Sequence, residues 1–236
     1  MPDAVNALYA IKKLVFEEKR LSLGELFQIL KQNWAGHEKL RQYVRQRYCY
    51  FGNDNPEVDT LAARLLTDFA AAVSALNGRS PFLFCAGVST FGREIEWRSH
   101  RLATPHGCRK GAVLAPNLSP TPGTDHKGAT AVIKSHCHAD LSQLACGLAL
   151  DLKLFPTCVQ GDTGINGLIG LLHGFISLGG FFMQPDVIDN AVLKEAQLHP
   201  EDYQTLSVRV SGWNARFVTL SKEWQDMVIA RTAQEM

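Results

Sequence analysis

Residues 208 to 217 read VRVSGWNARF and place one glycine, Gly212, between two stretches typical of β-strands. Glycine is common at the tip of a hairpin because it adopts a positive φ without steric cost. The stretch therefore predicts a β-hairpin that turns at Gly212. The pattern alone leaves open whether the glycine serves the turn, a chemical step, or both.

The composition is that of an ordinary globular protein. Of 236 residues, 46% are hydrophobic and 20% are charged, and 24 Lys and Arg balance 23 Asp and Glu to a net charge of +1. Such a chain is long enough to bury a substantial core in one large domain or two small ones. Because no basic field is present, we expect no nucleic-acid partner.

The cysteines and the N-terminal sequence favour a reducing compartment. No CxxC pair is present among Cys49, Cys85, Cys108, Cys137, Cys146 and Cys158. The stretch MPDAVNALYAIKK has no basic region of the kind that opens a signal peptide. We therefore expect reduced thiols and a cytoplasmic location.

Residues 164–183 contain no Asp, Glu, Lys or Arg over about the length that spans a bilayer. Six glycines lower the hydropathy of this stretch, and Gly179 and Gly180 would end a helix midway. A membrane helix is the alternative, but the pattern favours a buried helix over about residues 164–178 that leads into a buried strand. We expect no membrane association.

Capping signals predict helices in the first third of the chain. Ser22 and Glu25 have the spacing of a capping box, and Asn55 followed by Pro56 is a helix start. Apolar residues then keep a helical period until Asn77 and Gly78. Three or four packed helices are therefore expected before residue 78.

The middle of the chain changes character. PFLFCAGVS at residues 81–89 suggests a short buried strand, and TAVIK at 130–134 is a possible second one within a stretch rich in Gly, Pro, Thr, Ser and His. A strand through FFMQPDVI, a helix capped by Asp189, the hairpin and a last helix from Ser221 complete the predicted order.

Three other patterns have a chemical and a structural interpretation. His136, Cys137 and His138 suggest zinc, but no further ligands follow at a standard spacing, so buried or hydrogen-bonded side chains are favoured and no metal is expected. GDTGINGLIG from Gly161 lacks the lysine of a phosphate-binding loop and is better explained as a packed helix start. Cys85 is more readily a small apolar side chain than a nucleophile.

The C-terminal frame resembles the signature of the glycyl radical enzymes, the family of pyruvate formate-lyase, the glycerol and diol dehydratases and choline trimethylamine-lyase. The family core is matched by Arg209, Val210, Ser211, Gly212 and Trp213, followed by LSKEWQDMVIART. GNDNPEVD, LSPTPGTDHKGATAVIKS and LGGFFMQPDVIDNAVLKEAQLHPEDY also occur in family order. The resemblance covers the whole chain, which corresponds to roughly the last third of a family enzyme.

The resemblance implies a radical on the backbone of Gly212. Loss of a Cα hydrogen leaves a radical that the flanking peptide groups delocalise when the centre flattens, and a side chain would oppose that flattening. Val208, Val210, Trp213 and Phe217 are expected to bury the hairpin and exclude solvent. An iron–sulfur, S-adenosylmethionine-dependent activating enzyme is the implied partner, with no cofactor bound to the chain itself.

The resemblance also implies a fold and two domains. The expected class is α/β, with helices and strands forming part of a ten-stranded barrel and a C-terminal radical hairpin and helix. Residues 1–100 are assigned to the barrel and helical region of a pyruvate formate-lyase-like domain, and residues 101–236 to a glycine radical domain.

Departures from the family pattern limit the implied function. The catalytic cysteine of the family lies in a Gly-Cys-x-Glu context that is absent from this chain, and the usual TPDGR is replaced by Thr104-Pro105-His106-Gly107-Cys108. The chain is therefore expected to store a radical for an anaerobic lyase or dehydratase of a small organic substrate, and to be inactive without a segment or chain that carries the cysteine. The alternatives are a non-catalytic spare part that repairs an oxygen-damaged enzyme, and an inactive remnant.

Overall fold

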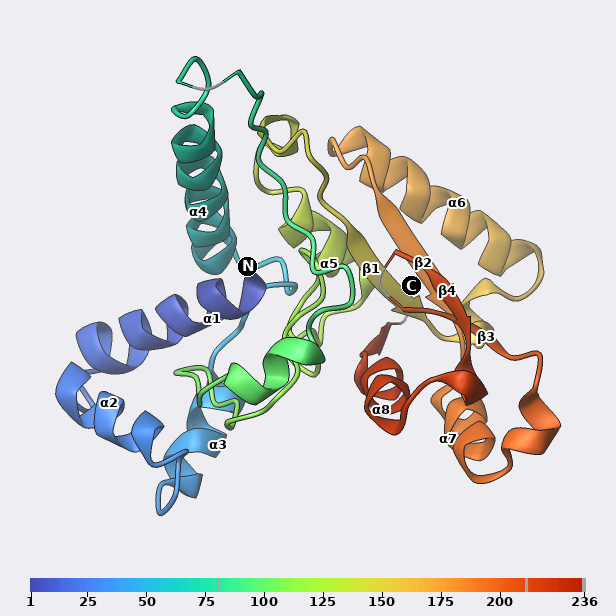
Figure 1. Ribbon diagram of the computed structural model, residues 1–236, viewed down its shortest axis with the longest axis horizontal. Coiled ribbons are helices and arrows are strands. Elements are labelled where there is room, and N and C mark those ends of the chain that lie inside the picture. The colour runs from blue at the N-terminus through green and yellow to red at the C-terminus, as the bar shows by residue number, and fades with distance from the viewer. Residues whose placement is uncertain (80, 211, 235–236) are drawn as a thin grey trace.

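The computed structural model describes residues 1–79, 81–210 and 212–234, and its N-terminal part is helical (Figure 1). Capping explains where two of these helices begin. The Ser22 hydroxyl accepts a hydrogen bond from the Glu25 amide at 3.2 Å, and the Asn55 side chain accepts one from the Glu57 amide at 3.3 Å. The predicted capping box and the predicted helix start are both confirmed. The helices are α1 (Pro2–Ile11), α2 (Leu23–Lys31), α3 (Glu38–Arg47) and α4 (Pro56–Ser74), with a π-helical segment at Lys12–Glu17 after α1.

A parallel sheet follows, in the strand order β2-β1-β5. It consists of β1 (Leu150–Leu154), β2 (Met183–Val187) and β5 (Ala233–Gln234). Leu150 pairs with Met183, and Lys153 pairs with Ala233. In Figure 1, α6 (Gly161–Ser177) lies above the β1–β2 pair, whereas α7 (Asn190–Leu198) and α8 (Lys222–Ala230) lie below it.

Three apolar cores hold these elements together. The first includes Trp34, Tyr50 and Phe51 among α1 to α4, together with leucines from residues 118–148. The second joins α5 (Ala129–His136), β1 and α6. The third joins α7, α8 and the hairpin strands β3 (Ser207–Arg209) and β4 (Asn214–Arg216). The hairpin is therefore fixed to two helices, and Asp189 caps α7 as predicted by accepting a hydrogen bond from the Ala191 amide at 2.8 Å.

Two predicted strands are absent from the described residues. TAVIK is helical and lies within α5, which begins after Gly128 at a φ of +82°. PFLFCAGVS forms no strand either, since it makes only one isolated bridge, between Val88 and Leu148, and the side chains of Phe82 and Leu83 are 72% and 84% exposed. Both predictions were wrong because a short apolar run does not determine its own partners.

The α6 helix was predicted correctly in position and incorrectly in burial. Leu171 and Phe175 pack into the second core, but the opposite side of the helix is open, and Ile176 is 68% exposed. None of the helices among the described residues is both long and apolar enough to cross a membrane.

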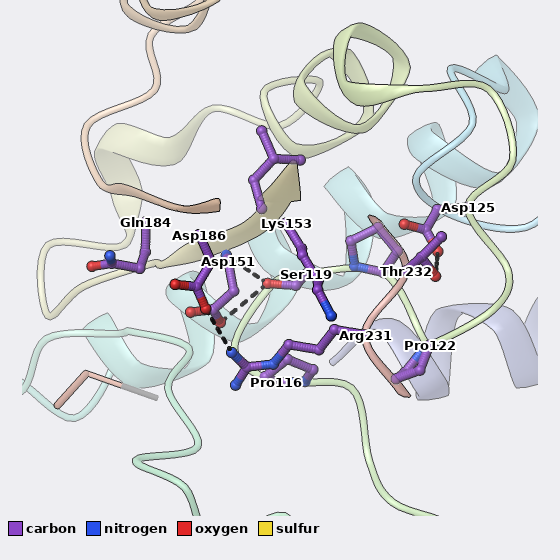
Figure 2. A pocket seen from close by; sticks show the side chains of 12 residues that line it. Pro116, Ser119, Pro122, Asp125, Asp151, Lys153, Gln184, Asp186, Arg231 and Thr232 are labelled. Carbon is purple, nitrogen blue, oxygen red and sulfur yellow. Dashed lines mark hydrogen bonds and ion pairs between the residues drawn. The ribbon is translucent and has the colours of Figure 1, made fainter. Parts of the chain in front are cut away.

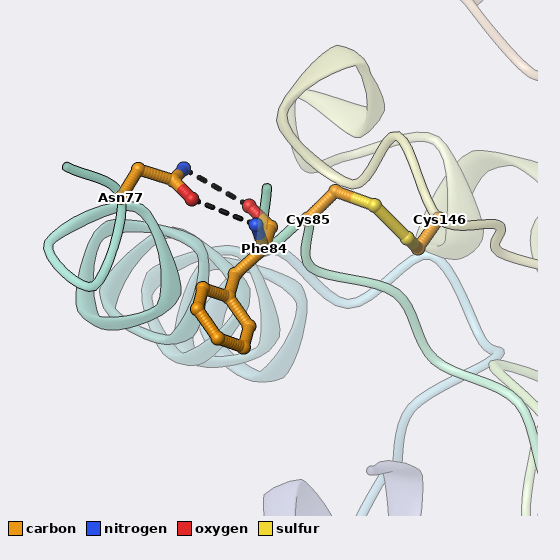
Figure 3. The surroundings of a disulfide bond; sticks show 4 residues. All are labelled: Asn77, Phe84, Cys85 and Cys146. Atoms are coloured by element: carbon orange, nitrogen blue, oxygen red, sulfur yellow. Dashed lines mark hydrogen bonds between the residues drawn. A yellow bond between two sulfur atoms is a disulfide. The ribbon is translucent and has the colours of Figure 1, made fainter. Parts of the chain in front are cut away.

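Cys85 and Cys146 form a disulfide, with 5.5 Å between their Cα atoms (Figure 3). This pairing contradicts the expectation that all six cysteines are reduced, and the expectation that Cys85 is a buried apolar side chain, because both residues are exposed. Next to the disulfide, the Asn77 side chain donates to the Phe84 carbonyl at 3.0 Å and accepts from the Phe84 amide at 2.7 Å. Residues 84–88 are thus tied to the end of α4 and to residues 146–148.

Candidate functional site: the hairpin at Gly212

The predicted hairpin is present and turns at Gly212. Arg209 pairs with Asn214 in the antiparallel register of β3 and β4. One step further, the Val210 amide donates a hydrogen bond to the Trp213 carbonyl at 2.8 Å. Gly212 is thus at the turn, and Ser211 of the predicted motif lies outside the described residues.

Gly212 is required by its backbone conformation and not by a lack of space. Its φ is +93°, in the region that side chains disfavour, and a Cβ built on it would meet no atom within 4 Å. Gly212 is also exposed. The turn alone accounts for glycine at this position, and the Cα hydrogen that a Cβ would replace points into open space.

The hairpin is buried on one side only. Val208, Val210 and Phe217 are 2%, 0% and 0% exposed and belong to the third core, as expected. Trp213 is 44% exposed, which corrects the expectation that its side chain helps to bury the hairpin. Its ring instead makes an edge-on contact with Trp224 of α8, with ring centroids 6.1 Å apart.

Arg231, which directly follows α8, holds the strand that leads into the turn. Its Nη1 donates to the Arg209 carbonyl at 2.9 Å, and its Nη2 donates to the Val210 carbonyl. Arg231 also forms an ion pair with Asp186 of β2 at 3.8 Å. A planar guanidinium suits two adjacent acceptors, so this contact sets the position of the last residues before the turn.

The side chain of Arg209 stays close to the hairpin. Its Nη1 donates to the Asn214 Oδ1 at 3.3 Å. Among the predicted site residues, the described ones, Arg209, Val210, Gly212 and Trp213, therefore lie together around one turn. The sequence did not indicate Arg231, and its only signal was its position in the last turn of the predicted final helix.

A cavity of about 230 Å³ lies beside Gly212. Its wall combines the exposed aromatic rings of Phe91, Phe181 and Phe182 with the polar side chains of Asn117 and Asp151. A cavity with mostly apolar walls and a few polar groups is typical of a small-molecule site. Here Gly212 forms part of the wall.

The polar side of this cavity is a connected network. The Asn117 Nδ2 donates to Asp151 Oδ2 at 2.7 Å, and the Ser119 hydroxyl donates to the same oxygen at 3.3 Å. The Thr90 amide donates to Asn117 Oδ1 at 3.0 Å. The network fixes the Asp151 carboxylate where it borders the cavity. Sequence patterns did not indicate these residues, because they come from segments up to 61 positions apart.

A second, smaller cavity of about 30 Å³ is lined by residues of β1 and β2 and by Arg231, and it contains several charged side chains (Figure 2). Lys153 points into it and donates to the Val228 carbonyl at 3.2 Å and to Asn190. Burial and the nearby charge of Arg231 lower the pKa of Lys153 to about 8. Burial raises the pKa of Asp186, although the charge of Arg231 opposes the rise. The Lys153 side chain thus connects β1 with α7 and α8.

The other sequence patterns have structural roles. His136 is buried with its Nδ1 3.2 Å from the Leu118 carbonyl, and burial lowers its pKa to about 4, whereas His138 lies 3.4 Å from the Thr60 hydroxyl. No group of three or more His, Cys, Asp or Glu side chains suited to a metal occurs in the described part of the chain. GDTGINGLIG starts α6, where a Cβ on Gly164 would lie 2.4 Å from the Val159 backbone, as close packing predicts.

The sequence matches two known protein families. The Glycine radical family matches residues 114–218, which include the hairpin, and the Pyruvate formate lyase-like family matches residues 1–93. The chain belongs to the glycyl radical enzyme family. It contains a glycine radical domain of the dehydratase and lyase type.

Curated relatives of this glycyl radical chain are considerably longer. It is 34% identical over 239 residues to isethionate sulfite-lyase of Bilophila wadsworthia, covering 98% of this chain and 28% of the relative. It is also 34% identical to the probable dehydratase YbiW of Escherichia coli, covering 96% and 29%. The chain thus spans less than a third of the length of the relatives it matches.

Solved structures of the family superpose closely on this fold. A protein studied for 1,2-propanediol dehydration in Roseburia inulinivorans matches with a TM-score of 0.94 and 33% identity over 99% of this chain and 30% of that one. The B12-independent glycerol dehydratase of Clostridium butyricum matches with a TM-score of 0.94 and 32% identity, over 100% and 30%. The α/β arrangement of this chain is therefore part of a glycyl-radical-enzyme barrel.

Proposed function

We propose that Gly212 stores a glycyl radical and that this chain is the radical-bearing C-terminal component of a lyase or dehydratase. The observation that carries the proposal is Gly212 itself, an exposed glycine at the tip of a hairpin inside the Glycine radical match. Its neighbours Arg209, Val210, Ser211 and Trp213 form the motif around it. The substrate class is a small organic molecule, in keeping with the cavity that Gly212 borders.

The proposal divides the chain into two parts. Residues 1–100 contribute helical and barrel structure of the pyruvate formate-lyase type, and residues 101–236 form the glycine radical domain. Helices α1 to α4 lie within the first part, whereas the sheet, the hairpin and the third core lie within the second. The first core joins the two parts, because Leu118, Leu141, Leu144 and Leu148 pack into it.

The proposed chemistry requires an activating enzyme and a cysteine that this chain does not supply. An iron–sulfur, S-adenosylmethionine-dependent activating enzyme removes one hydrogen atom from the Cα of Gly212. A cysteine outside these 236 residues, in the same polypeptide or in another chain, then returns a hydrogen atom to Gly212 and becomes the thiyl radical that reacts with the substrate. The exposed rings of Phe91, Phe181 and Phe182 support this arrangement, because they leave the cavity beside Gly212 open to a further segment.

The turn geometry favours this radical position for a physical reason. The radical is most stable when the Cα and its two peptide groups become coplanar, and a Cβ would resist that change. Glycine has no Cβ, and the space that a Cβ would take on Gly212 is open to 4 Å. The Arg231 contacts keep the preceding strand in place while the turn residue changes shape.

Radical spectroscopy after anoxic activation tests the proposal. The protein is incubated without oxygen with a radical S-adenosylmethionine activating enzyme, and electron paramagnetic resonance is recorded before and after exposure to air. We expect an organic radical signal, followed by backbone cleavage at Gly212 when oxygen is admitted. Mass spectrometry of the fragments locates the cleavage.

Gly179 supplies a matched control. Its φ of +85° and its empty Cβ position resemble those of Gly212, so Gly179→Ala and Gly212→Ala impose a similar backbone cost. Gly212→Ala should abolish the signal and the cleavage, and Gly179→Ala should retain both. A signal that survives in Gly212→Ala, or cleavage at another glycine, would place the radical elsewhere.

A further inference from the structure

A buried turn outside the hairpin contains a cysteine and a histidine that the proposed radical function does not use. Residues 104–108 read TPHGC, and the Thr104 amide donates to the Cys108 carbonyl at 3.0 Å. The Cys108 amide in turn donates to the Thr104 hydroxyl at 3.2 Å. Arg41 of α3 donates to the Gly107 carbonyl at 3.1 Å. The turn is therefore closed on itself and fixed to the N-terminal helices.

This turn places a thiol against an imidazole. The Cys108 Sγ lies 3.3 Å from the His106 Nε2, and the same nitrogen lies 3.4 Å from the Asp3 Oδ1. Asp3 also forms an ion pair with Arg101 at 2.6 Å. His106 is 1% exposed and Cys108 is 8% exposed, so the group is shielded from bulk water and its charges interact strongly.

The charges in the group favour a thiolate and an imidazolium. Burial alone would lower the pKa of His106, but hydrogen bonds with Asp3 and Cys108 outweigh burial and raise that pKa. Burial alone would raise the pKa of the Cys108 thiol, but the hydrogen bond and charge of His106 lower it. Asp3, whose own pKa is held low by His106 and Arg101 against the effect of burial, supplies the balancing negative charge.

The group opens onto a cavity and retains an unused polar atom. The cavity measures about 430 Å³, and Tyr50, His106, Cys108 and His126 lie on its wall. The Nδ1 of His106 is buried and makes no hydrogen bond within the described ranges. The cavity therefore gives a small ligand space beside the Cys108 thiol.

Two of the other free cysteines, Cys49 and Cys137, differ from Cys108 in their electrostatic surroundings. Burial raises the pKa of Cys49, and burial raises the pKa of Cys137 to about 11. Because the thiolate is the reactive form of cysteine, these two side chains react slowly near neutral pH. They serve as internal references within the same molecule.

We propose that Cys108 and His106 form a thiolate–imidazolium pair and that Cys108 is a site of reversible modification by small-molecule disulfides that enter this cavity. In the exchange, the Cys108 thiolate attacks one sulfur of the disulfide and a new S–S bond forms as the old one breaks. The other half of the disulfide leaves as a thiolate and takes a proton from water. The disulfide is the oxidant and Cys108 is oxidised. His106 stays protonated, and its imidazolium remains paired with the Asp3 carboxylate.

The test uses 4,4′-dithiodipyridine as the disulfide and follows each cysteine by mass spectrometry. The rate at Cys108 is measured from about pH 5 to pH 9, beside the rates at Cys49 and Cys137. We expect Cys108 to react at least about tenfold faster than both at about pH 6, and to keep most of its rate where theirs falls. The charged and titratable groups facing the pair are Asp3, Arg101, Tyr50, Arg45 and the N-terminal amine.

Two variants test whether His106 is the source of the Cys108 reactivity. His106→Asn should lower the Cys108 rate at about pH 6 by roughly tenfold or more and shift its pH profile toward that of an ordinary thiol. His199→Asn, which changes an exposed histidine that is not on this cavity, should leave the profile unchanged. If the wild-type profile of Cys108 follows that of Cys49, the proposal is wrong, and this comparison needs no variant. None of these readouts depends on Gly212 or on an activating enzyme.

Discussion

Gly212 satisfies two separate demands with one residue. The turn needs a positive φ, and the proposed radical needs a Cα that can flatten. Other glycines in the chain meet the first demand alone, as Gly179 does at the end of α6. The geometry of Gly212 is therefore not distinctive by itself. Three features distinguish it: Gly212 borders a cavity, Arg231 binds the strand that precedes it, and the family match covers the hairpin.

Asp59 makes stability depend on pH at the scale of one residue. It is 1% exposed in α4, and its Oδ2 accepts a hydrogen bond from the Ser135 hydroxyl at 3.0 Å. Burial raises its pKa to about 6, and the hydrogen bond from Ser135 and the nearby His138 only partly oppose that rise, which Asp54 reinforces. The folded state therefore binds the proton more tightly than the unfolded state does.

The sign of the effect follows from that raised pKa. The stabilising contribution of Asp59 is complete below the unfolded pKa of about 4 and is lost as the pH rises through about 6, by about 3 kcal/mol in total. Urea unfolding of the wild type and of Asp59→Asn should show a free-energy difference that shifts in favour of the variant by about 2 kcal/mol between pH 4 and pH 7, which is most of that total. A difference that stays constant with pH would show that Asp59 does not titrate in this range.

At the scale of elements, local signals predicted the helices well. A capping residue acts within its own turn, so Ser22, Asn55 and Asp189 each mark a helix that the structure contains. The hairpin was equally predictable, because its turn and both arms lie within ten residues. The resemblance to the family supplied Gly212 as a candidate, which the turn pattern alone did not.

Features that depend on distant partners were not predictable. TAVIK forms a helix because α5 packs against β1 and α6, and the sequence of five residues carries no sign of that packing. Cys85 and Cys146 are 61 positions apart, so no spacing rule pairs them. The same limit hid the Asn117–Asp151 network and the contact of His106 with Asp3, which is 103 positions away in the sequence.

Among the contacts between elements, those of Arg231 have the clearest expected effect on the stability of the hairpin. Arg231→Lys keeps the positive charge near Asp186, but a single ammonium group cannot match the geometry with which the guanidinium reaches both carbonyls. We expect the variant to lose about 1–3 kcal/mol of hairpin stability. Hydrogen exchange at the Val210 amide, which donates to the Trp213 carbonyl, should become at least about fivefold faster.

Arg216 provides the control for that substitution. It lies on β4 of the same hairpin, but its side chain is exposed. Arg216→Lys should therefore leave the exchange of the Val210 amide unchanged. Equal exchange rates in the two variants would mean that the Arg231 guanidinium does not hold the strand.

At the scale of the whole molecule, the chain exposes apolar surface that a complete core would cover. Ile165, Ile169, Leu172 and Ile176 are 53%, 47%, 36% and 68% exposed, and their spacing places them on one side of α6. Large exposed apolar patches are uncommon on monomeric proteins. Because the chain covers only 28% to 30% of its matched relatives, the proposal that another part of the enzyme packs here accounts for this stripe.

The stripe on α6 predicts how the 236-residue chain behaves by itself. It should bind a hydrophobic dye such as 1-anilinonaphthalene-8-sulfonate and self-associate with rising concentration, because the stripe has no cover. The double variant Ile169→Ser and Ile176→Ser should lower both dye fluorescence and the apparent mass in sedimentation. Leu198→Ser removes a side chain that is 72% exposed at the end of α7, outside the stripe, and should change either readout far less. If Leu198→Ser has the larger effect, the exposed surface that drives association lies away from α6, and this helix face is not where a further part of the enzyme packs.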